Sequence, residues 1–304
     1  MDKKKIVLIK RNWQLYILFA FPLAWFVIFR YWPMFGIQIA FKDFMPGDTI
    51  LNAKWIGLAN FQKFFRHYYF KELIRNTLSI TIYQLIASFP IPIIFALALN
   101  ATHRTGLKKA VQYITYMPYF ISTVVMVGIM MMLMNPRIGI INNAIELFGG
   151  KRIDFMAEPK LFSSVYVWSG IWKYFGWNSI IYLAALSGIS PELHESAMID
   201  GASRFKRILY VDIPGIMPTM IVLLIINCGQ IMTVGFEKIF LMQNNLNLSV
   251  SQVISTYVYT VGLRSMPPEF SYGSAIDMFN SIINLLLIII VNKLAQKFSE
   301  TSLW

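Results

Sequence analysis

Residues 77–100 read TLSITIYQLIASFPIPIIFALALN and contain no charged side chain. An α-helix needs about 20 mainly apolar residues to cross the roughly 30 Å hydrocarbon core of a membrane. Further runs of this kind cover residues 13–33, 111–134, 162–186, 216–242 and 273–294. Backbone polar groups in lipid must be hydrogen-bonded within their own segment, so each run is expected to be helical. The sequence therefore predicts an all-α polytopic membrane protein with about six transmembrane helices.

The composition agrees with a membrane protein. Of the 304 residues, 57% are hydrophobic and only 14% are charged, and the mean hydropathy is +0.56. A soluble domain usually has about 25% charged residues, so the low charged fraction of this chain excludes a soluble enzyme. Its high apolar content excludes a disordered chain. The net charge of +12 comes from basic residues that lie mostly between the apolar runs. This placement indicates a role beside the lipid bilayer, so no nucleic-acid partner is predicted.

The N-terminal tail, residues 1–12, sets the predicted orientation. It carries five basic residues, Lys3, Lys4, Lys5, Lys10 and Arg11. The apolar run that follows is too long for a signal peptide and has no small-residue cleavage site, so it is expected to stay as the first span. With the tail in the cytoplasm, six spans place the C-terminus there too. Only about half of the 27 Lys and Arg residues then face the cytoplasm, so the opposite orientation stays open.

The rest of the chain, residues 13–304, is predicted to form a single transmembrane domain with an external segment at residues 34–75. A short amphipathic helix is expected in this segment, with Asn60 as its N-cap. Its apolar side chains follow helical spacing and are Phe61, Phe64, Phe65 and Tyr68. Two interpretations stay open: a helix lying in the membrane interface, or an ordinary helix packed on the rest of the protein.

The loop at residues 187–215 has the local signals of two helices. Ser190 can cap the first helix, Pro191 and Glu192 suit its first turn, and Gly201 can end it in a left-handed conformation. This predicts a helix over residues 191–200. A second helix is expected over residues 203–211, with Pro214 as its stop. The loop should therefore form a compact helical knob, residues 190–214, that projects from the membrane.

The knob contains, in order, Glu195, Ser196, Ala197, Asp200, Gly201, Ala202, Ser203, Phe205, Ile213 and Pro214. This pattern resembles the EAA loop of permease subunits of binding-protein-dependent ABC importers. The chain departs from that motif at Ser196, where Ala is usual, which is a change between small residues. The resemblance implies the type I permease fold of ABC importers. It also implies that these residues dock into a cytoplasmic ATPase subunit and couple its closure to the membrane helices.

Three early motifs narrow the resemblance to permeases for complex oligosaccharides. They are Tyr31-Trp32-Pro33-Met34-Phe35-Gly36, Ile39-Ala40-Phe41-Lys42-Asp43 and Trp55-Ile56-Gly57-Leu58-Ala59-Asn60-Phe61. The resemblance implies a location in the bacterial cytoplasmic membrane. It also implies four kinds of partner: a second homologous permease, a dimer of cytoplasmic ABC ATPases, an external solute-binding protein and an oligosaccharide substrate.

The chain lacks the motifs of an enzyme. No G-x-x-x-x-G-K-[ST] sequence is present to hold the phosphates of ATP, so ATP and Mg²⁺ are expected on the partner ATPase subunits. The three histidines, His67, His103 and His194, are far apart in the sequence, and no metal site is expected. No nucleophile motif is present either, so we expect no cofactor and no catalytic residue in this chain.

Polar side chains inside the apolar runs are candidates for a solute path, because polar groups at membrane depth usually face a cavity or another helix. The candidates are Tyr83, Gln84, Lys173, Trp177, Asn178, Asn227, Gln230, Asp277, Asn280 and Asn284. The alternative is that the amides join neighbouring helices by hydrogen bonds. Lys173 is expected either to pair with Asp277 or to extend to the interface. Pro90 and Pro92 should loosen the second span.

The main functional hypothesis is one permease subunit of an oligosaccharide ABC importer. The alternative is a secondary transporter or channel that needs no ATPase. Such a protein is expected to show inverted repeats or a series of intramembrane carboxylates, and neither is visible in this sequence. A membrane scaffold is a third interpretation, but it leaves the capped helical loop without an explanation.

Overall fold

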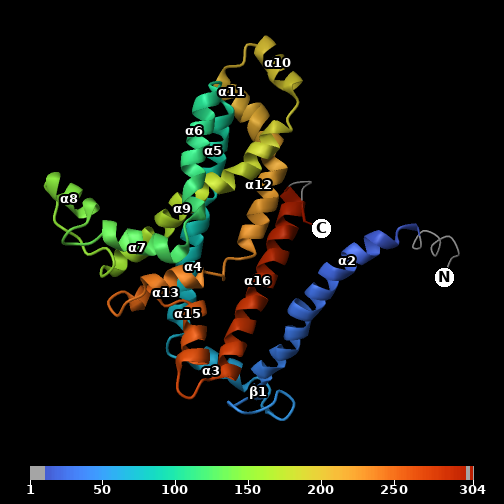
Figure 1. Cartoon of the computed structure of the whole chain (residues 1–304), viewed down its shortest axis with the longest axis vertical. Helices are drawn as coiled ribbons and strands as arrows, with labels where there is room; N and C mark the ends of the chain where they lie inside the picture. The colour runs from blue at the N-terminus through green and yellow to red at the C-terminus, as the bar shows by residue number, and fades with distance from the viewer. Residues whose placement is uncertain (1–10, 299–301, 304) are drawn as a thin grey trace. The chain divides into compact units, whose positions relative to one another are not determined.

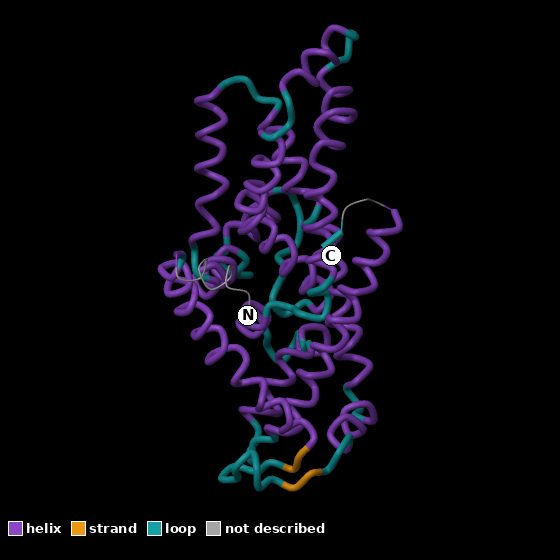
Figure 2. The backbone as a smooth tube through the Cα atoms, turned by 90° about the vertical axis from the view of Figure 1, so that its right-hand side faces the viewer, coloured by secondary structure: helices purple, strands orange, loops and turns teal. Residues whose placement is uncertain are grey.

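The structure, a computed structural model, describes residues 11–298 and 302–303, so Lys3, Lys4, Lys5 and Lys10 lie outside the described residues. Helices make up most of the described chain (Figure 2). The two strands found there are the antiparallel pair β1 (Lys42–Asp43) and β2 (Lys54–Trp55), with Lys42 opposite Trp55. The all-α prediction is therefore correct. The chain divides into two compact units, residues 1–65 with 260–278, and residues 66–259 with 279–304.

The first unit begins with a long helical run. Its elements are α2 (Trp13–Phe26), a π-helical turn (Val27–Tyr31), a 3₁₀ segment (Trp32–Phe41), the two strands, α3 (Ala59–Arg66), a second π-helical turn (Thr260–Arg264) and the start of α16 (Phe270–Phe298). The first span was predicted to end at residue 33. Instead the helical run continues to Phe41, because Pro33 lies in the first turn of the 3₁₀ segment, where no hydrogen-bonded N–H is needed.

Helix α3 is the amphipathic helix predicted in the external segment. Phe64 is buried on its inner side, and Lys63 pairs with Glu269. Helix α3 therefore packs on residues of its own unit, and both interpretations of its place relative to the membrane stay predictions. The prediction that Asn60 is the N-cap is wrong, because the helix starts at Ala59. The Asn60 amide instead donates to the backbone oxygen atoms of Ala40 at 3.0 Å and Lys42 at 3.3 Å.

The second unit contains most of the helices. They are α4 (Phe70–Ser88), α5 (Pro90–Asn100), α6 (Thr105–Tyr116), a 3₁₀ turn (Met117–Phe120), α7 (Thr123–Leu133), α8 (Ile140–Leu147), α9 (Pro159–Ser187), α10 (Pro191–Ile199), α11 (Arg204–Arg207), a π-helical segment (Ile208–Asp212), α12 (Ile213–Cys228), α13 (Phe236–Met242), α14 (Leu248–Ser251), α15 (Ile254–Tyr259) and the later part of α16.

Helix α9 lies at the centre of this unit, between two groups of buried side chains. One group joins Ile80 of α4 and Met126 of α7 to Phe162 and Val167 of α9. The other group joins Ile93 and Leu97 of α5 to Tyr182 and Leu186 of α9 and Ile216 of α12. Figure 1 shows α10 lying beyond the ends of α5 and α12. The central helix thus connects the buried core to the loop that carries the knob.

Four of the described helices are long and apolar enough to cross a membrane: Trp13–Phe41, Phe70–Asn100, Arg204–Cys228 and Phe270–Lys297. Helix α9 has 29 residues and sufficient length, but the lysines, serines and glycines within it lower its hydropathy. The second span includes both α4 and α5, with a break at Phe89 next to Pro90, as the two prolines predicted. The count of six spans and the placement of the termini stay predictions.

The third predicted span is not one continuous helix. The segments Thr105–Phe120 and Thr123–Leu133 meet at an angle of 103°. Pro118 lies in the 3₁₀ turn at the bend, and Ile121 has an extended backbone. The Ser122 hydroxyl then accepts a hydrogen bond from the Val125 N–H at 3.3 Å and starts α7. The apolar run at residues 111–134 therefore contains a helix stop and a new helix start.

The fifth predicted span has the wrong limits. The membrane-length helix covers Arg204–Cys228, with Gly229 as the capping residue after its end, and α13 is a separate helix. Pro214 does not stop the second helix of the loop. It lies in the first turn of α12, and the π-helical segment before it widens the backbone and lets the helical run continue.

Candidate functional site

The start of the knob is fixed by local hydrogen bonding. The Ser190 hydroxyl accepts from the Glu192 N–H at 3.3 Å, Pro191 occupies the first turn, and Glu192 places a negative charge near the positive end of the helix. The resulting helix, α10, covers Pro191–Ile199. Its predicted start is therefore correct, and its predicted end differs by one residue.

The corner after α10 depends on Gly201, which has φ +75. The Gly201 N–H donates to the Met198 oxygen at 3.0 Å, and the Ala202 N–H donates to the Ala197 oxygen at 2.9 Å. This pair of bonds is a Schellman motif, in which a left-handed residue closes the helix end. Ser203 then caps α11, because its hydroxyl accepts from the Lys206 N–H at 3.4 Å. The predicted left-handed role of Gly201 is confirmed.

The predicted coupling residues fall into two groups. Those at the outer part of the knob are exposed, and they include Glu195, Ser196, Asp200, Gly201, Ser203 and Phe205. Ala197 and Ala202 are half-buried in the corner. Ile213 packs against the buried group around Ile93 and Ile216, while Pro214 is exposed in the first turn of α12. The fold thus brings the residues up to Phe205 onto one projecting surface and places the last two at the base of a membrane helix.

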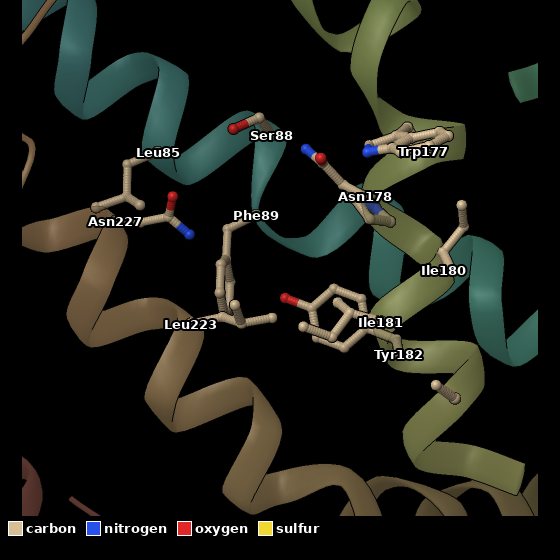
Figure 3. A pocket seen from close by; sticks show the side chains of 12 residues that line it. Leu85, Ser88, Phe89, Trp177, Asn178, Ile180, Ile181, Tyr182, Leu223 and Asn227 are labelled. Carbon is tan, nitrogen blue, oxygen red and sulfur yellow. The ribbon is translucent and has the colours of Figure 1, made fainter. Parts of the chain in front are cut away.

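A cavity of about 610 Å³ lies between the helices of the second unit (Figure 3). It is lined by Leu85, Ser88, Phe89, Pro92, Trp177, Asn178, Ile180, Ile181, Tyr182, Ala184, Leu223 and Asn227. The amide groups of Asn178 from α9 and Asn227 from α12 turn toward the space between the helices. The lining residues include aromatic rings and hydrogen-bonding groups but no charged side chain.

Three of the predicted path residues line this cavity: Trp177, Asn178 and Asn227. Sequence reasoning missed Ser88, Phe89 and Tyr182, which contribute two hydroxyl groups and two aromatic rings. Ser88 and Phe89 directly precede Pro90. The helix break expected at this proline was the sequence signal that could have identified them as cavity residues. The indole ring of Trp177 stacks on Tyr119, with ring centroids 4.1 Å apart and nearly parallel planes.

The other candidates have different surroundings. The Tyr83 hydroxyl accepts from the Trp168 Nε1–H at 2.9 Å, and the Asn284 amide donates to the Thr233 hydroxyl at 2.8 Å. Asn280 is buried, while Gln84 is half-buried and Gln230 and Asp277 are exposed. None of these side chains lines the cavity of Figure 3. Asn284 follows the alternative interpretation, in which a polar side chain joins neighbouring segments.

Lys173 is only 4% exposed, so it does not extend to a membrane interface. Its ammonium group donates to the Thr123 hydroxyl at 3.4 Å and lies 5.2 Å from the centre of the Tyr174 ring. Lys173 belongs to the second unit and Asp277 to the first, so the predicted pairing of these two residues stays a prediction. No group of His, Cys, Asp and Glu side chains that fits a metal ion occurs among the described residues.

Apolar helices of membrane-spanning length, a cavity lined by apolar side chains, rings and two amides and a capped, exposed loop are together the features of a polytopic membrane transporter. Residues 81–300 match the family described as "Binding-protein-dependent transport system inner membrane component". The chain belongs to this family of ABC importer permeases, which lie in the bacterial cytoplasmic membrane.

Curated relatives from Bacillus subtilis (strain 168) match the chain over almost all of its length. The polygalacturonan/rhamnogalacturonan transport system permease protein YteP is 38% identical, and the match covers 100% of this chain and 94% of the relative. Protein LplB is also 38% identical, over 97% of this chain and 92% of the relative. The arabinooligosaccharides transport system permease protein AraP is 27% identical, and the match covers 90% of this chain and 84% of the relative.

Solved structures share the fold. A bacterial alginate ABC transporter, in complex with a periplasmic protein that holds an alginate pentasaccharide, contains a chain 37% identical to this one. The match has a TM-score of 0.89 and covers 97% of this chain and 98% of that chain. A second structure, of a bacterial ABC transporter involved in the import of the acidic polysaccharide alginate, matches with a TM-score of 0.88 and 37% identity. The match covers 97% of this chain and 99% of that chain. The predicted permease fold is therefore confirmed.

Proposed function

We propose that this chain is one of two homologous permease subunits that together form the membrane path for an oligosaccharide. An external solute-binding protein delivers the sugar, and two cytoplasmic ATPase subunits supply the energy. This chain binds no nucleotide, and ATP with Mg²⁺ is held by the ATPase subunits. The relatives support this proposal, because their names associate them with polygalacturonan, rhamnogalacturonan and arabino-oligosaccharides.

The observation that carries the proposal is the exposed knob with its Schellman corner at Gly201. No residue of α10 is buried within this chain, and the exposed surface includes the charged side chains of Glu195 and Asp200. Such a surface is suited to docking against a second protein. In the proposed mechanism, ATP-driven closure of the ATPase pair moves the knob. The membrane helices move with the knob, and the path then opens to the other side of the membrane. Because coupling between two sites is reciprocal, delivery of the solute must also favour closure of the ATPase pair.

The cavity in Figure 3 is suited to a sugar. Phe89 and Trp177 offer rings that can stack on the apolar side of a sugar ring. Asn178 and Asn227 supply donors and acceptors for hydroxyl groups. Because no charged side chain lines this cavity, stacking and neutral hydrogen bonds are the contacts it provides. We propose that it forms this chain's part of the oligosaccharide path.

The proposal is tested by affinity purification of the tagged chain from its native host in mild detergent, followed by mass spectrometry. Recovery of a second permease and an ATPase is expected. The ATPase should be lost from Glu195→Lys and Gly201→Val variants, since both change the knob. Asp43→Lys is the matched control, because Asp43 is an exposed acid in β1 of the other unit. Repeated recovery of the parent chain alone would instead favour the ATP-independent transporter.

The substrate is tested with the purified complex in proteoliposomes together with its binding protein. Oligogalacturonides, alginate oligosaccharides and arabino-oligosaccharides serve as probes, and ATP hydrolysis is the readout. Stimulation by at least one of these sugars is expected. Stimulation by amino acids, with no response to any sugar, would contradict the assignment to oligosaccharides.

A further inference from the structure

Asp212 lies at the base of the knob, at the end of the π-helical segment that leads into α12. It is only 5% exposed, although it carries a carboxyl group. Its Oδ1 atom lies 3.4 Å from Nε2 of His194 in α10. The same oxygen accepts a hydrogen bond from the Asn100 amide, at the end of α5, at 3.5 Å. One carboxylate oxygen thus contacts side chains from two other helices.

A second cavity, of about 430 Å³, is lined by these three residues. It separates α10 from the ends of α5 and α9, and its wall also includes His103, Arg207 and Glu195. The Nε atom of Arg207 is buried and has no hydrogen-bond partner among the described residues. The base of the knob therefore contains an incompletely filled space in which these polar groups lie beside apolar side chains.

Apolar packing does not fix the orientation of α10. No residue of this helix is buried, whereas Ile189, directly before it, packs into the core group around Leu186 and Ile216. In the part of the chain that the structure describes, the contact between His194 and Asp212 is the one polar side-chain contact from α10 to another helix. A displacement of α10 therefore reaches the membrane helices either through this contact or through the backbone at its two ends.

We propose that Asp212 is a positioning residue for energy coupling: it holds α10 against the cytoplasmic ends of α5 and α12, so that both helices follow the knob. This inference rests on the proposed importer function. Breaking the contact leaves the exposed docking surface of α10 in place, because Asp212 is not part of that surface. It removes the side-chain connection through which movement of α10 reaches α5 and α12 together. The expected defect is in coupling and not in assembly.

The test uses the complete transporter complex in proteoliposomes, with oligogalacturonides as the probe and the ratio of solute-stimulated to basal ATP hydrolysis as the readout. Asp212→Asn and His194→Gln should each reduce this ratio about fivefold, which is the low end of coupling between two sites. The double variant should show the same ratio as Asp212→Asn alone, because the His194 contact has Asp212 as its partner and is already altered in that variant. His103→Gln is the matched control, since His103 lines the same cavity without contacting Asp212.

A second measurement does not depend on the sugar. Hydrogen exchange is followed in the segments 97–101, 191–199 and 208–213 of the complex, before and after it is trapped with ATP and vanadate. In the parent protein the three segments should change together. In Asp212→Asn, only the segment of α10 should respond.

Four results would overturn the inference. They are a normal ratio in Asp212→Asn, an equal loss in His103→Gln, additive losses in the double variant, and a joint response of the three segments in Asp212→Asn. If Asp212→Asn fails to insert, the comparison of His194→Gln with His103→Gln decides the question. Failure of the proposed function is distinguishable, because the parent chain would then copurify with no ATPase at all.

Discussion

The Ala202 N–H donates to the Ala197 carbonyl oxygen at 2.9 Å, across the left-handed backbone of Gly201. This bond turns the chain back at the tip of the knob. A Cβ atom added at Gly201 would find no heavy atom within 4 Å. The chain needs glycine at position 201 because of the left-handed backbone conformation. A side chain at this position would not clash with other atoms of this chain.

Gly201→Val should insert normally but associate about tenfold more weakly with the ATPase. A β-branched residue in the left-handed region costs about 1–2 kcal/mol, which opens the corner and shifts the docking surface. Asn accepts this conformation more readily, so Gly201→Asn should retain most of the association. The measurement is the amount of ATPase that copurifies per permease. Equal losses in the two variants would show that the backbone conformation is not the cause.

Ser190→Ala should weaken the start of α10 by about 1 kcal/mol, because the Glu192 N–H loses its acceptor. Hydrogen exchange in the first turn of α10 should then be about fivefold faster. Ser187→Ala is the matched control, since the Ser187 hydroxyl donates to the Ala184 oxygen within α9 and caps no helix start. Unchanged exchange in Ser190→Ala would mean that the serine cap does not stabilise α10.

The sequence predicted the start and the corner of α10 correctly because these features depend on neighbours along the chain. Ser190 reaches the N–H two residues later, and Gly201 ends the helix through its own backbone. Signals of this kind need no tertiary contact. Hydropathy also identified the apolar segments, since the length needed to cross a membrane is a property of each segment alone.

Continuity of the helices was harder to predict, because hydropathy does not report backbone breaks. The apolar run around Pro118 and Ser122 is divided by a bend of 103°, although no charged residue marks it. Pro214 is the opposite case, a proline that was expected to end a helix. The π-helical segment Ile208–Asp212 allows the helix to continue through it.

The lining of the cavity was only partly predictable, because it depends on which face of each helix meets its neighbours. Trp177 and Asn178 of α9 and Asn227 of α12 line the cavity. Lys173 is also in α9, but it is buried and contacts Thr123. Asp212 was missed as a polar contact inside the bundle. The signal was a single acid between Val211 and Ile213, since an isolated charge in an apolar stretch usually has a buried partner.

Asn284→Ala should lower the thermal stability of the protein. It should leave unchanged the sugar concentration needed for half-maximal ATP hydrolysis. The side chain accepts from the Met232 N–H at 2.9 Å and donates to Thr233, and each hydrogen bond contributes about 1 kcal/mol. Asn227→Ala should show the reverse pattern, because Asn227 lines the cavity and is exposed within this chain. Thermal unfolding in detergent and sugar-stimulated ATP hydrolysis measure the two effects. A transport defect confined to Asn284→Ala would return that residue to the solute path.

Trp177→Ala should raise the sugar concentration needed for half-maximal ATP hydrolysis about tenfold. The cavity loses an aromatic ring that lines it and that is held in place by stacking on Tyr119, and an aromatic stacking contact contributes about 0.5–1.5 kcal/mol beyond its buried area. Trp177→Phe keeps a ring and should recover most of the loss. Trp172→Ala is the control, since Trp172 lies on the same helix, is 47% exposed and does not line the cavity. The assay uses proteoliposomes with saturating binding protein, so that delivery is not limiting. Equal shifts for Trp172→Ala and Trp177→Ala would remove the cavity from the path, because only one of these side chains lines it.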